Sequence, residues 1–179
     1  MLSGHNIEGI SLIEIMIALV VLGLLLALGA PSFSVFMKNA QIRDGASAVQ
    51  NGLQVARTEA IKRNEVVTFT LPGPGTSWTV ASASTTIEAY DGATGNSTVE
   101  VSVPPPAALP VAIAFDGLGK TTLIEQATIQ LTNPIAGACD TGPSTGDMRC
   151  LNVVVAVGGQ IKMCDPHPGI AAGDTRKCP

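Results

Sequence analysis

One carboxylate lies inside the most apolar stretch of the chain. The run from Ile10 to Ala30 holds 21 residues, and Glu14 is its only charged side chain. As a helix with a rise of about 1.5 Å per residue, this run spans roughly 31 Å, which matches the apolar core of a bilayer. An acid within a membrane helix costs on the order of 2.5 to 3.5 kcal/mol to insert, so it indicates a functional site. The alternative is that Glu14 reaches the membrane interface from its place near the helix start.

A cleaved secretory signal peptide is a second interpretation of the same run. The nine residues before Ile10 contain no Lys or Arg, and no A-x-A cleavage site lies at the end of the run. The run is also longer than the usual apolar region of about 7 to 15 residues. We therefore expect the helix to be retained.

Four cysteines lie in the last quarter of the chain: Cys139, Cys150, Cys164 and Cys178. An exported domain meets an oxidising compartment, which favours disulfides. Zinc is the less favoured alternative, because the spacing C-x10-C-x13-C-x13-C has no C-x2-C pair and His167 is the only histidine nearby. Four cysteines allow three pairings. We favour Cys139 with Cys150 and Cys164 with Cys178, because short loops are readily closed.

Basic residues gather in the same C-terminal region. From residue 149 onward there are four basic residues and two acids, although the net charge of the whole chain is −4. The basic residues are Arg149, Lys162, Arg176 and Lys177, and the acids are Asp165 and Asp174. A solvated tail is the plainer interpretation. The alternative is a cationic patch that contacts the phosphates of DNA.

Other candidate motifs do not predict catalysis. Residues 114–121 fit a relaxed P-loop, A-x4-G-K-T, but such a loop needs a parallel α/β sheet, so we expect a tight turn here. Asp140 and Asp147 lie in a turn-rich stretch, where solvation is the default interpretation. Neither His5 nor His167 stands in an arrangement that activates a nucleophile. We expect no enzyme activity, no cofactor and no metal site.

Hydrophobic periodicity predicts the elements that position these residues. Beyond Pro31, which removes one backbone hydrogen bond and is expected to kink the helix, apolar residues recur at spacings of three and four. This pattern predicts an amphipathic helix to about Asn64, with its apolar stripe formed by Ile42, Ala46, Val49, Leu53, Ala56 and Ala60. On the solvated side, Glu59 is spaced to face Lys62 and Arg63.

From Glu65 the period changes to two, which is typical of strands. Val67, Phe69 and Leu71 point one way, and the threonines between them point the other. Further strands are predicted at residues 78–83, 86–90, 98–103, 111–115, 128–131, 151–157 and 160–163, with a hairpin at Gly158-Gly159. The fold class is therefore α+β: a long N-terminal helix, membrane-spanning in its first half, packed on an antiparallel sheet or sandwich with C-terminal disulfides.

The N-terminus resembles a known family. Gly9 followed by ISLIEI, an apolar run and Pro31 is similar to the start of type IV pilins and of the pseudopilins of type II secretion. The resemblance implies that a prepilin peptidase cleaves between Gly9 and Ile10 and that Ile10 becomes N-methylated. It also implies that Glu14 lies beside the cleaved α-amino group of a neighbouring subunit, where pairing offsets the cost of a buried charge. The family usually has Phe at the cleaved position and a basic leader, whereas this chain has Ile10 and a leader without Lys or Arg.

The rest of the chain is similar to the GspH/FimT branch of that family. The segments GGQIKMCDP and GDTRKCP look like the C-terminal tail of that branch. The implied organisation is a leader at 1–9, a transmembrane or filament-core helix at 10–30, its amphipathic continuation at 31–64 and a β head domain at 65–179. Some members bind DNA through basic tail residues, which here implies Lys162, Arg176 and Lys177, with Gln160 and Lys162 standing where arginines are usual.

The resemblance implies a minor pilin that enters a type IV pilus and helps to prime its assembly. A type II secretion pseudopilin and a DNA-binding minor pilin for DNA uptake are the alternatives. The implied partners are other major and minor pilins or pseudopilins, the prepilin peptidase, the inner membrane and, in the third case, DNA. The implied location is the inner membrane with the C-terminal domain in the periplasm, and the cell exterior once the chain is in a pilus.

Overall fold

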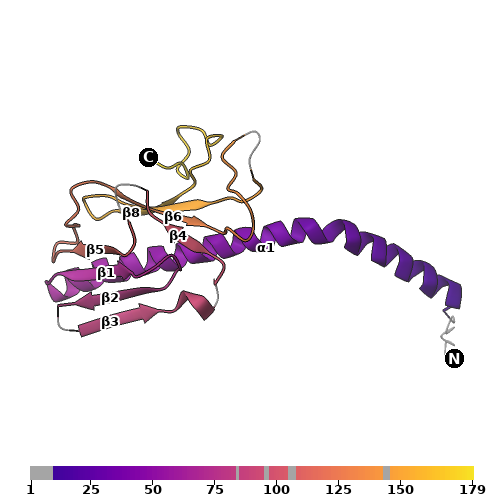
Figure 1. The fold of residues 1–179 in the computed structure, drawn as a ribbon, viewed down its shortest axis with the longest axis horizontal. Coiled ribbons are helices and arrows are strands. Elements are labelled where there is room, and N and C mark those ends of the chain that lie inside the picture. The colour runs from indigo at the N-terminus through magenta and orange to yellow at the C-terminus, as the bar shows by residue number, and fades with distance from the viewer. Residues whose placement is uncertain (1–9, 84, 95–96, 105–107, 143–145) are drawn as a thin grey trace, which may run out of the picture. The chain divides into compact units, whose positions relative to one another are not determined.

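The computed structural model describes residues 10–83, 85–94, 97–104, 108–142 and 146–179, apart from the side chains of residues 28–32 (Figure 1). Gly9 and the rest of the expected leader lie outside the described residues. The chain divides into two compact units, one that ends at Phe36 and one that runs from Met37 to Pro179.

The first unit contains the N-terminal part of α1, the helix Leu12–Arg63. Large apolar side chains from Ile10 to Leu26 are exposed along it. The helix continues through Pro31, so the expected loss of one hydrogen bond does not end it, and the kink stays a prediction. Among the described residues, no helix meets the length and apolarity of a membrane span.

The second unit begins with the amphipathic part of α1. Its predicted apolar stripe is confirmed, because the six side chains of that stripe are fully buried. On the opposite face, the Glu59 carboxylate accepts hydrogen bonds from Lys62 Nζ at 3.1 Å and from Arg63 Nε at 2.7 Å. These bonds, first from Arg63 and then from Lys62, lower the pKa of Glu59. The helix ends where Asn64 adopts a φ of 52°, a left-handed conformation typical of the residue after a helix.

Within the described residues, eight strands follow the helix and form two four-stranded antiparallel sheets. The first sheet has the order β3-β2-β1-β5 and the second has the order β4-β6-β7-β8 (Figure 1). The strands are β1 Val67–Leu71, β2 Trp78–Ser82, β3 Thr85–Tyr90, β4 Glu100–Ser102, β5 Val111–Phe115, β6 Ala127–Thr132, β7 Leu151–Val155 and β8 Ile161–Cys164, with a short 3-10 helix η1 at Gly92–Thr94. The predicted α+β class is confirmed.

Two predicted strands extend two or more residues beyond the observed ones. The strand expected at 98–103 is reduced to β4, and the one expected at 151–157 ends at Val155. The second difference has a local cause: Ala156 donates to the carbonyl oxygen of Gln160 at 2.9 Å, and Gly159 N–H donates to the carbonyl of Ala156 at 2.8 Å. Gly159 has a φ of 80°, which the turn between β7 and β8 requires.

The register of the first sheet places its apolar residues on one face. Phe69 lies opposite Val80 on β2 and opposite Ile113 on β5, and all three are buried. Fully burying a side chain of this size contributes roughly 1.5–3 kcal/mol to folding. The inward faces of the two sheets and the stripe of α1 therefore make the core of the second unit.

Gly52 lies where α1 packs closely on the first sheet. A Cβ atom on Gly52 would lie 2.6 Å from Trp78 Cδ2 and 2.7 Å from Phe69 Cε2. Atoms of non-bonded side chains do not approach this closely without displacement. The glycine therefore lets the helix backbone pack directly on the aromatic pair.

The segment that resembles a P-loop forms the predicted tight turn after β5. Asp116 N–H donates to the carbonyl of Lys120 at 2.9 Å, and the Asp116 carboxylate accepts from the backbone N–H groups of Leu118 and Lys120, both at 2.9 Å. A carboxylate thus occupies backbone donors that a P-loop would offer to phosphate.

Candidate functional site

Glu14 lies in the first turn of α1 and is exposed. Its backbone N–H donates to the carbonyl of Ser11 at 3.1 Å. Helical spacing places Ile17 and Ala18 on the same face, three and four residues further along. Among the described residues no cation pairs with its carboxylate. This carboxylate in an apolar helix surface is the first candidate site.

Ile10 begins the described chain and is 73% exposed. Cleavage after Gly9 and methylation of Ile10 stay predictions, as does the assembly role of Glu14.

The four cysteines form two disulfides close to each other in sequence. Cys139 bonds to Cys150, and Cys164 bonds to Cys178. This is the pairing that the short-loop argument favours. The first bond closes the loop before β7, and the second ties the C-terminal tail to the end of β8.

The tail runs beside β8 and brings the three predicted DNA-binding residues together. Lys162 Nζ donates to the backbone carbonyl of Lys177 at 3.0 Å. The N–H of Asp165 donates to the carbonyl of Arg176 at 2.7 Å, and Asp165 and Lys177 form a parallel β-bridge. The second candidate site is therefore this basic tail, defined as Lys162, Arg176 and Lys177.

A neighbouring acid neutralises one of the three cations. Arg176 Nε lies 3.1 Å from Asp174 Oδ1, and Arg176 Nη2 lies 2.7 Å from Asp174 Oδ2. These side-chain hydrogen bonds are the main reason that the pKa of Asp174 falls to about 2, and they raise the pKa of Arg176. The Asp174 carboxylate therefore occupies the Nε and Nη2 edge of the guanidinium group, which could otherwise bind a phosphate through two hydrogen bonds.

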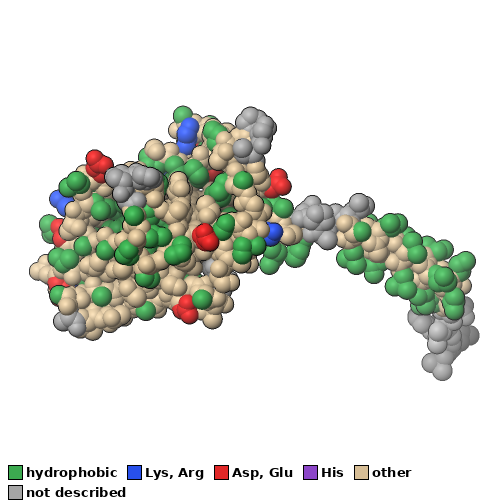
Figure 2. Space-filling view, viewed as in Figure 1, with side chains coloured by type: hydrophobic (Ala, Val, Ile, Leu, Met, Phe, Trp, Pro, Cys, Tyr) green, Lys and Arg blue, Asp and Glu red, His purple; other side chains and the backbone are tan. Residues whose placement is uncertain are grey.

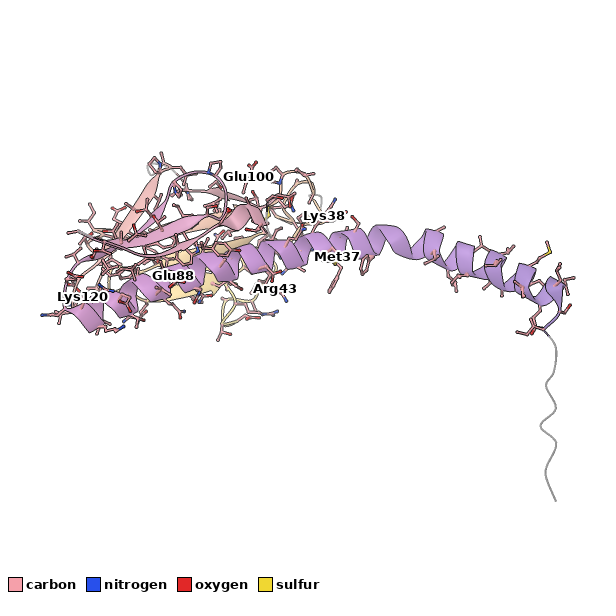
Figure 3. All side chains as sticks on the ribbon, turned by 90° about the horizontal axis from the view of Figure 1, so that it is seen from below. Met37, Lys38, Arg43, Glu88, Glu100 and Lys120 are labelled. Atoms are coloured by element: carbon pink, nitrogen blue, oxygen red, sulfur yellow. A yellow bond between two sulfur atoms is a disulfide. The ribbon has the colours of Figure 1, made fainter. Side chains whose placement is uncertain are left out.

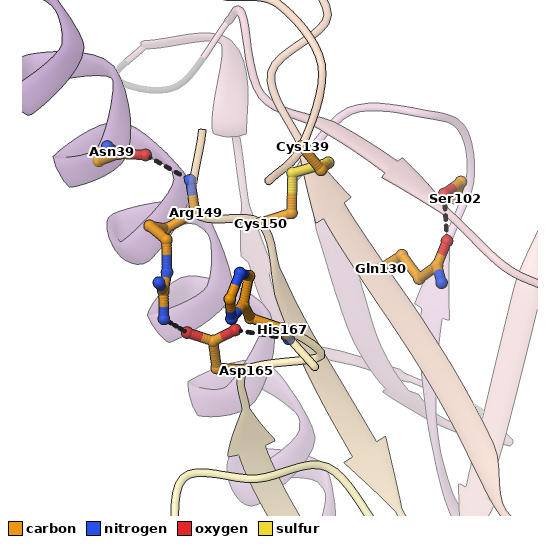
Figure 4. The surroundings of a disulfide bond; sticks show 8 residues. All are labelled: Asn39, Ser102, Gln130, Cys139, Arg149, Cys150, Asp165 and His167. Carbon is orange, nitrogen blue, oxygen red and sulfur yellow. Dashed lines mark hydrogen bonds and ion pairs between the residues drawn. A yellow bond between two sulfur atoms is a disulfide. The ribbon is translucent and has the colours of Figure 1, made fainter. Parts of the chain in front are cut away.

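A network of polar side chains links the two disulfide-bonded segments, and Figure 4 shows part of it. Arg149 Nη2 lies 2.6 Å from Asp165 Oδ2, and the Asp165 carboxylate also accepts the N–H of His167 at 2.9 Å. His167 Nε2 in turn lies 3.2 Å from Asp140 Oδ1. The N–H of Arg149 donates to Asn39 Oδ1 at 2.8 Å, which connects the network to α1 within the second unit.

The expectation that Asp140 is simply solvated is wrong. Its side chain is 28% exposed and contacts both His167 and, at 4.0 Å, Arg149 Nη1. The arrangement is structural, because its contacts join the loop, the tail and the helix. Within the part of the chain that the structure describes, no group of three or more metal-binding side chains is found.

Sequence reasoning missed this network because its members come together only through folding. Asp140 and His167 are far apart in the chain, and no periodicity relates them. The pairing of Asp174 with Arg176 is different, since the two residues are two positions apart and their opposite charges were visible in GDTRKCP.

Comparisons with known proteins address the family and the fold. A family model described as "Type II transport protein GspH" matches residues 45–159, which is more than half of the chain. Two crystal structures of the type IV minor pilin FimU from Pseudomonas aeruginosa are similar in fold. One has a TM-score of 0.55 and 14% identity and covers 72% of this chain and 91% of FimU. The other has a TM-score of 0.52 and 15% identity and covers 68% and 90%.

No curated protein matches the chain. At such low identity the FimU structures establish the fold alone, whereas the family model covers both the amphipathic part of α1 and most of the two sheets. The chain therefore belongs to the GspH family and is a pilin-like protein of the GspH/FimT type.

Proposed function

We propose that this chain is a minor pilin, a low-abundance structural subunit that enters a type IV pilus through α1 and helps to prime its assembly. The observation that carries this proposal is Glu14, a carboxylate on a helix surface otherwise made of exposed apolar side chains, in a member of the GspH family. A large exposed apolar surface of this kind indicates contact with lipid or with other proteins. A structural role also fits a family of assembly subunits better than catalysis does.

The mature chain in this proposal begins at Ile10. A prepilin peptidase removes the leader, Ile10 is N-methylated, and α1 holds the protein in the inner membrane with its head in the periplasm until it enters a pilus outside the cell. N-terminal sequencing of membrane-extracted protein tests this step. Retention of Met1, or a cut near Ala30, would contradict it.

In this proposal Glu14 sets the register between neighbouring subunits in the filament. The α-amino group of a neighbouring subunit lies beside its carboxylate, because an unpaired charge within an apolar helix bundle is far costlier than a paired one. The partners are accordingly other major and minor pilins.

The experiment compares Glu14→Ala and Glu14→Asp with the matched control Ser11→Ala, which changes the polar residue that directly precedes α1. Glu14→Ala should leave the protein in the inner membrane fraction but strongly reduce its amount in sheared fibres. Glu14→Asp should reduce it less, and Ser11→Ala should leave it unchanged. Normal incorporation of the Glu14→Ala variant into fibres would refute the proposed role of Glu14 in setting the register between subunits.

A pseudopilin of a type II secretion system is the alternative within the same structural class. The description of the matching family names type II transport, whereas the similar solved structures are pilins. Both assemblies would use the same helix. Identification of the subunits that co-purify with the chain after crosslinking in cells separates the two cases.

DNA binding by the basic tail stays a third hypothesis. The tail gathers Lys162, Arg176 and Lys177 as that hypothesis requires. The Arg176 guanidinium group, however, forms an ion pair with Asp174, and Lys162 already donates to a backbone carbonyl. These contacts reduce the positive charge that the tail offers to DNA, so they disfavour this hypothesis relative to assembly, and a binding measurement tests it.

A further inference from the structure

The strand β3 has one edge without a partner strand among the described residues. It pairs only with β2, and no other strand of its sheet lies beyond it. Figure 1 shows β3 as the outermost strand of that sheet. All six of its residues are exposed or half-exposed.

The sequence of this strand suits pairing with another extended chain. TTIEAY is rich in β-branched and aromatic residues and contains no Pro or Gly. Edge strands of this kind present unpaired N–H and C=O groups, and proteins guard them with charges, prolines or bulges. Here the protecting features are one charge, Glu88, and a bulge in β3 at Ile87, because Val80 of β2 pairs with Glu88 whereas Ala81 pairs with Thr86.

Contacts within the chain hold the C-terminal end of β3 in place without a partner. Tyr90 stacks on Trp78 with ring centroids 5.7 Å apart and an interplanar angle of 20°. After the strand, Asp91 Oδ1 accepts the N–H of Ala93 at 2.9 Å, and Ser77 Oγ accepts the N–H of Gly92 at 3.0 Å. A preformed edge loses little conformational entropy when a second strand adds to it.

Charge indicates which strand the edge would accept. Residues 64–119, which contain every strand of the first sheet, include no Lys or Arg and carry five acids: Glu65, Glu88, Asp91, Glu100 and Asp116. Figure 2 shows acidic and no basic side chains on the lower rim, where Figure 1 places β3. Glu88 is labelled in Figure 3, which views the molecule from that side.

Self-pairing is disfavoured by the same charge. If two copies paired in a register with Glu88 opposite Glu88, the two carboxylates would lie on the same face of the ladder, and like charges directly opposite each other are destabilising. An opposite charge facing Glu88 is favourable by the same principle.

We propose that the free edge of β3 is a strand-addition site for an extended segment of another protein that carries Lys or Arg opposite Glu88. Backbone hydrogen bonds to β3 would supply the affinity, and the ion pair with Glu88 would select the partner. This inference does not depend on whether the chain serves in a pilus or in a secretion system.

The test uses the full chain in detergent micelles and two synthetic peptides. Each is seven residues of alternating Thr and Val, with either Lys or Glu at the centre. Amide hydrogen exchange reports which backbone groups become protected. We expect the Lys peptide to slow exchange within Thr85–Tyr90 and to bind up to about fivefold more tightly than the Glu peptide.

Two charge reversals make the test decisive. Glu88→Lys should invert the preference, so that the Glu peptide binds more tightly. The matched control Glu100→Lys, an exposed acid on β4 of the other sheet, should leave the preference unchanged. The proposal is overturned if β3 gains no protection, if Glu88→Lys keeps the original preference, if Glu100→Lys inverts it too, or if the chain alone pairs with itself along β3.

Discussion

The Asp174 carboxylate binds the Arg176 guanidinium group through two nitrogens, with the shorter contact, Nη2 to Oδ2, at 2.7 Å. Arg176 N–H also donates to Asp174 Oδ1 at 2.8 Å, so the backbone and the side chain of one residue bind the same acid. This pair includes Arg176, one of the three cations of the basic tail. The Asp174–Arg176 pair therefore affects both how the stability of the tail depends on pH and how much positive charge the tail presents to a partner.

The first prediction concerns pH. The ordinary pKa of Asp174 is 3.8, and hydrogen bonds from Arg176 lower it to about 2 in the folded chain. Because the folded value is the lower one, the pair stabilises the tail above pH 3.8, and this stabilisation is lost as the pH falls toward 2. An NMR titration of the Asp174 side-chain carboxyl should show a midpoint near 2. In Arg176→Gln the midpoint should return toward 3.8, and an unchanged midpoint would show that Arg176 is not the cause.

The second prediction concerns DNA. Asp174→Asn removes the carboxylate that pairs with the Arg176 guanidinium group, so the affinity for duplex DNA at low salt should rise. Because Arg176 can then contact one more phosphate, the slope of the log binding constant against log salt concentration should steepen by about one. The control is Asp147→Asn, which changes the net charge equally at an exposed site outside the tail.

In the same assay, changing Lys162, Arg176 and Lys177 to Ala should abolish salt-sensitive binding. If the oxidised chain and Asp174→Asn both bind no DNA at low ionic strength, the DNA hypothesis fails, and the assembly role is unaffected.

The third prediction concerns the tail disulfide. Cys164 and Cys178 are separated by 14 positions, and a bond that closes a loop of about 15 residues contributes roughly 3 kcal/mol in the chain-entropy model. Replacing both with Ser should lower the free energy of unfolding by about that amount. It should also release the Asp165 N–H from the Arg176 carbonyl, which hydrogen exchange detects.

The matched control for that variant is the double Ser variant of Cys139 and Cys150, whose separation is 11. It should lose a similar free energy but keep the Asp165 N–H protected. Equal loss of protection in the two variants would show that the tail is not held locally by its own disulfide.

The fourth prediction concerns Gly52. An Ala side chain there improves helix propensity by about 1 kcal/mol but collides with Trp78 and Phe69, and overpacking costs about 1–3 kcal/mol. We expect a net loss of stability in thermal unfolding. Gly158→Ala is the control, because no atom lies within 4 Å of its added Cβ, and an equal loss in that variant would exclude the collision as the cause.

Local patterns predicted most of the elements. The apolar stripe of α1 and the alternation in β1 were readable because burial repeats with the geometry of the helix or the strand, and both are confirmed. The strand at Val111–Phe115 was predicted with its observed bounds. Errors at strand ends arose where a turn competes with the ladder for the same backbone groups, as at Ala156.

The arrangement of the strands was not readable from those patterns. β4 follows β3 in sequence but joins β6 in the second sheet, and β5 returns to β1 in the first. Such pairings depend on which apolar faces meet α1, so no local signal encodes them. The contacts of Arg149 with Asp140 and Asp165 depend in turn on the pairing of β7 with β8, because that pairing brings the loop before β7 beside the residues that follow β8.

The last prediction concerns Arg149, whose guanidinium joins that loop to the tail. The Asp165 side chain is only 14% exposed, so removing its cation leaves a largely desolvated carboxylate with fewer partners. Arg149→Met keeps much of the apolar stem and should lower the free energy of unfolding by about 1–2 kcal/mol. Lys62→Met is the matched control: Lys62 is 70% exposed and Glu59 keeps its bond to Arg63, so the midpoint of thermal unfolding should stay nearly unchanged. If both variants melt like the unmodified chain, the Arg149 network does not hold the tail, and the disulfide together with the backbone bonds beside β8 is sufficient.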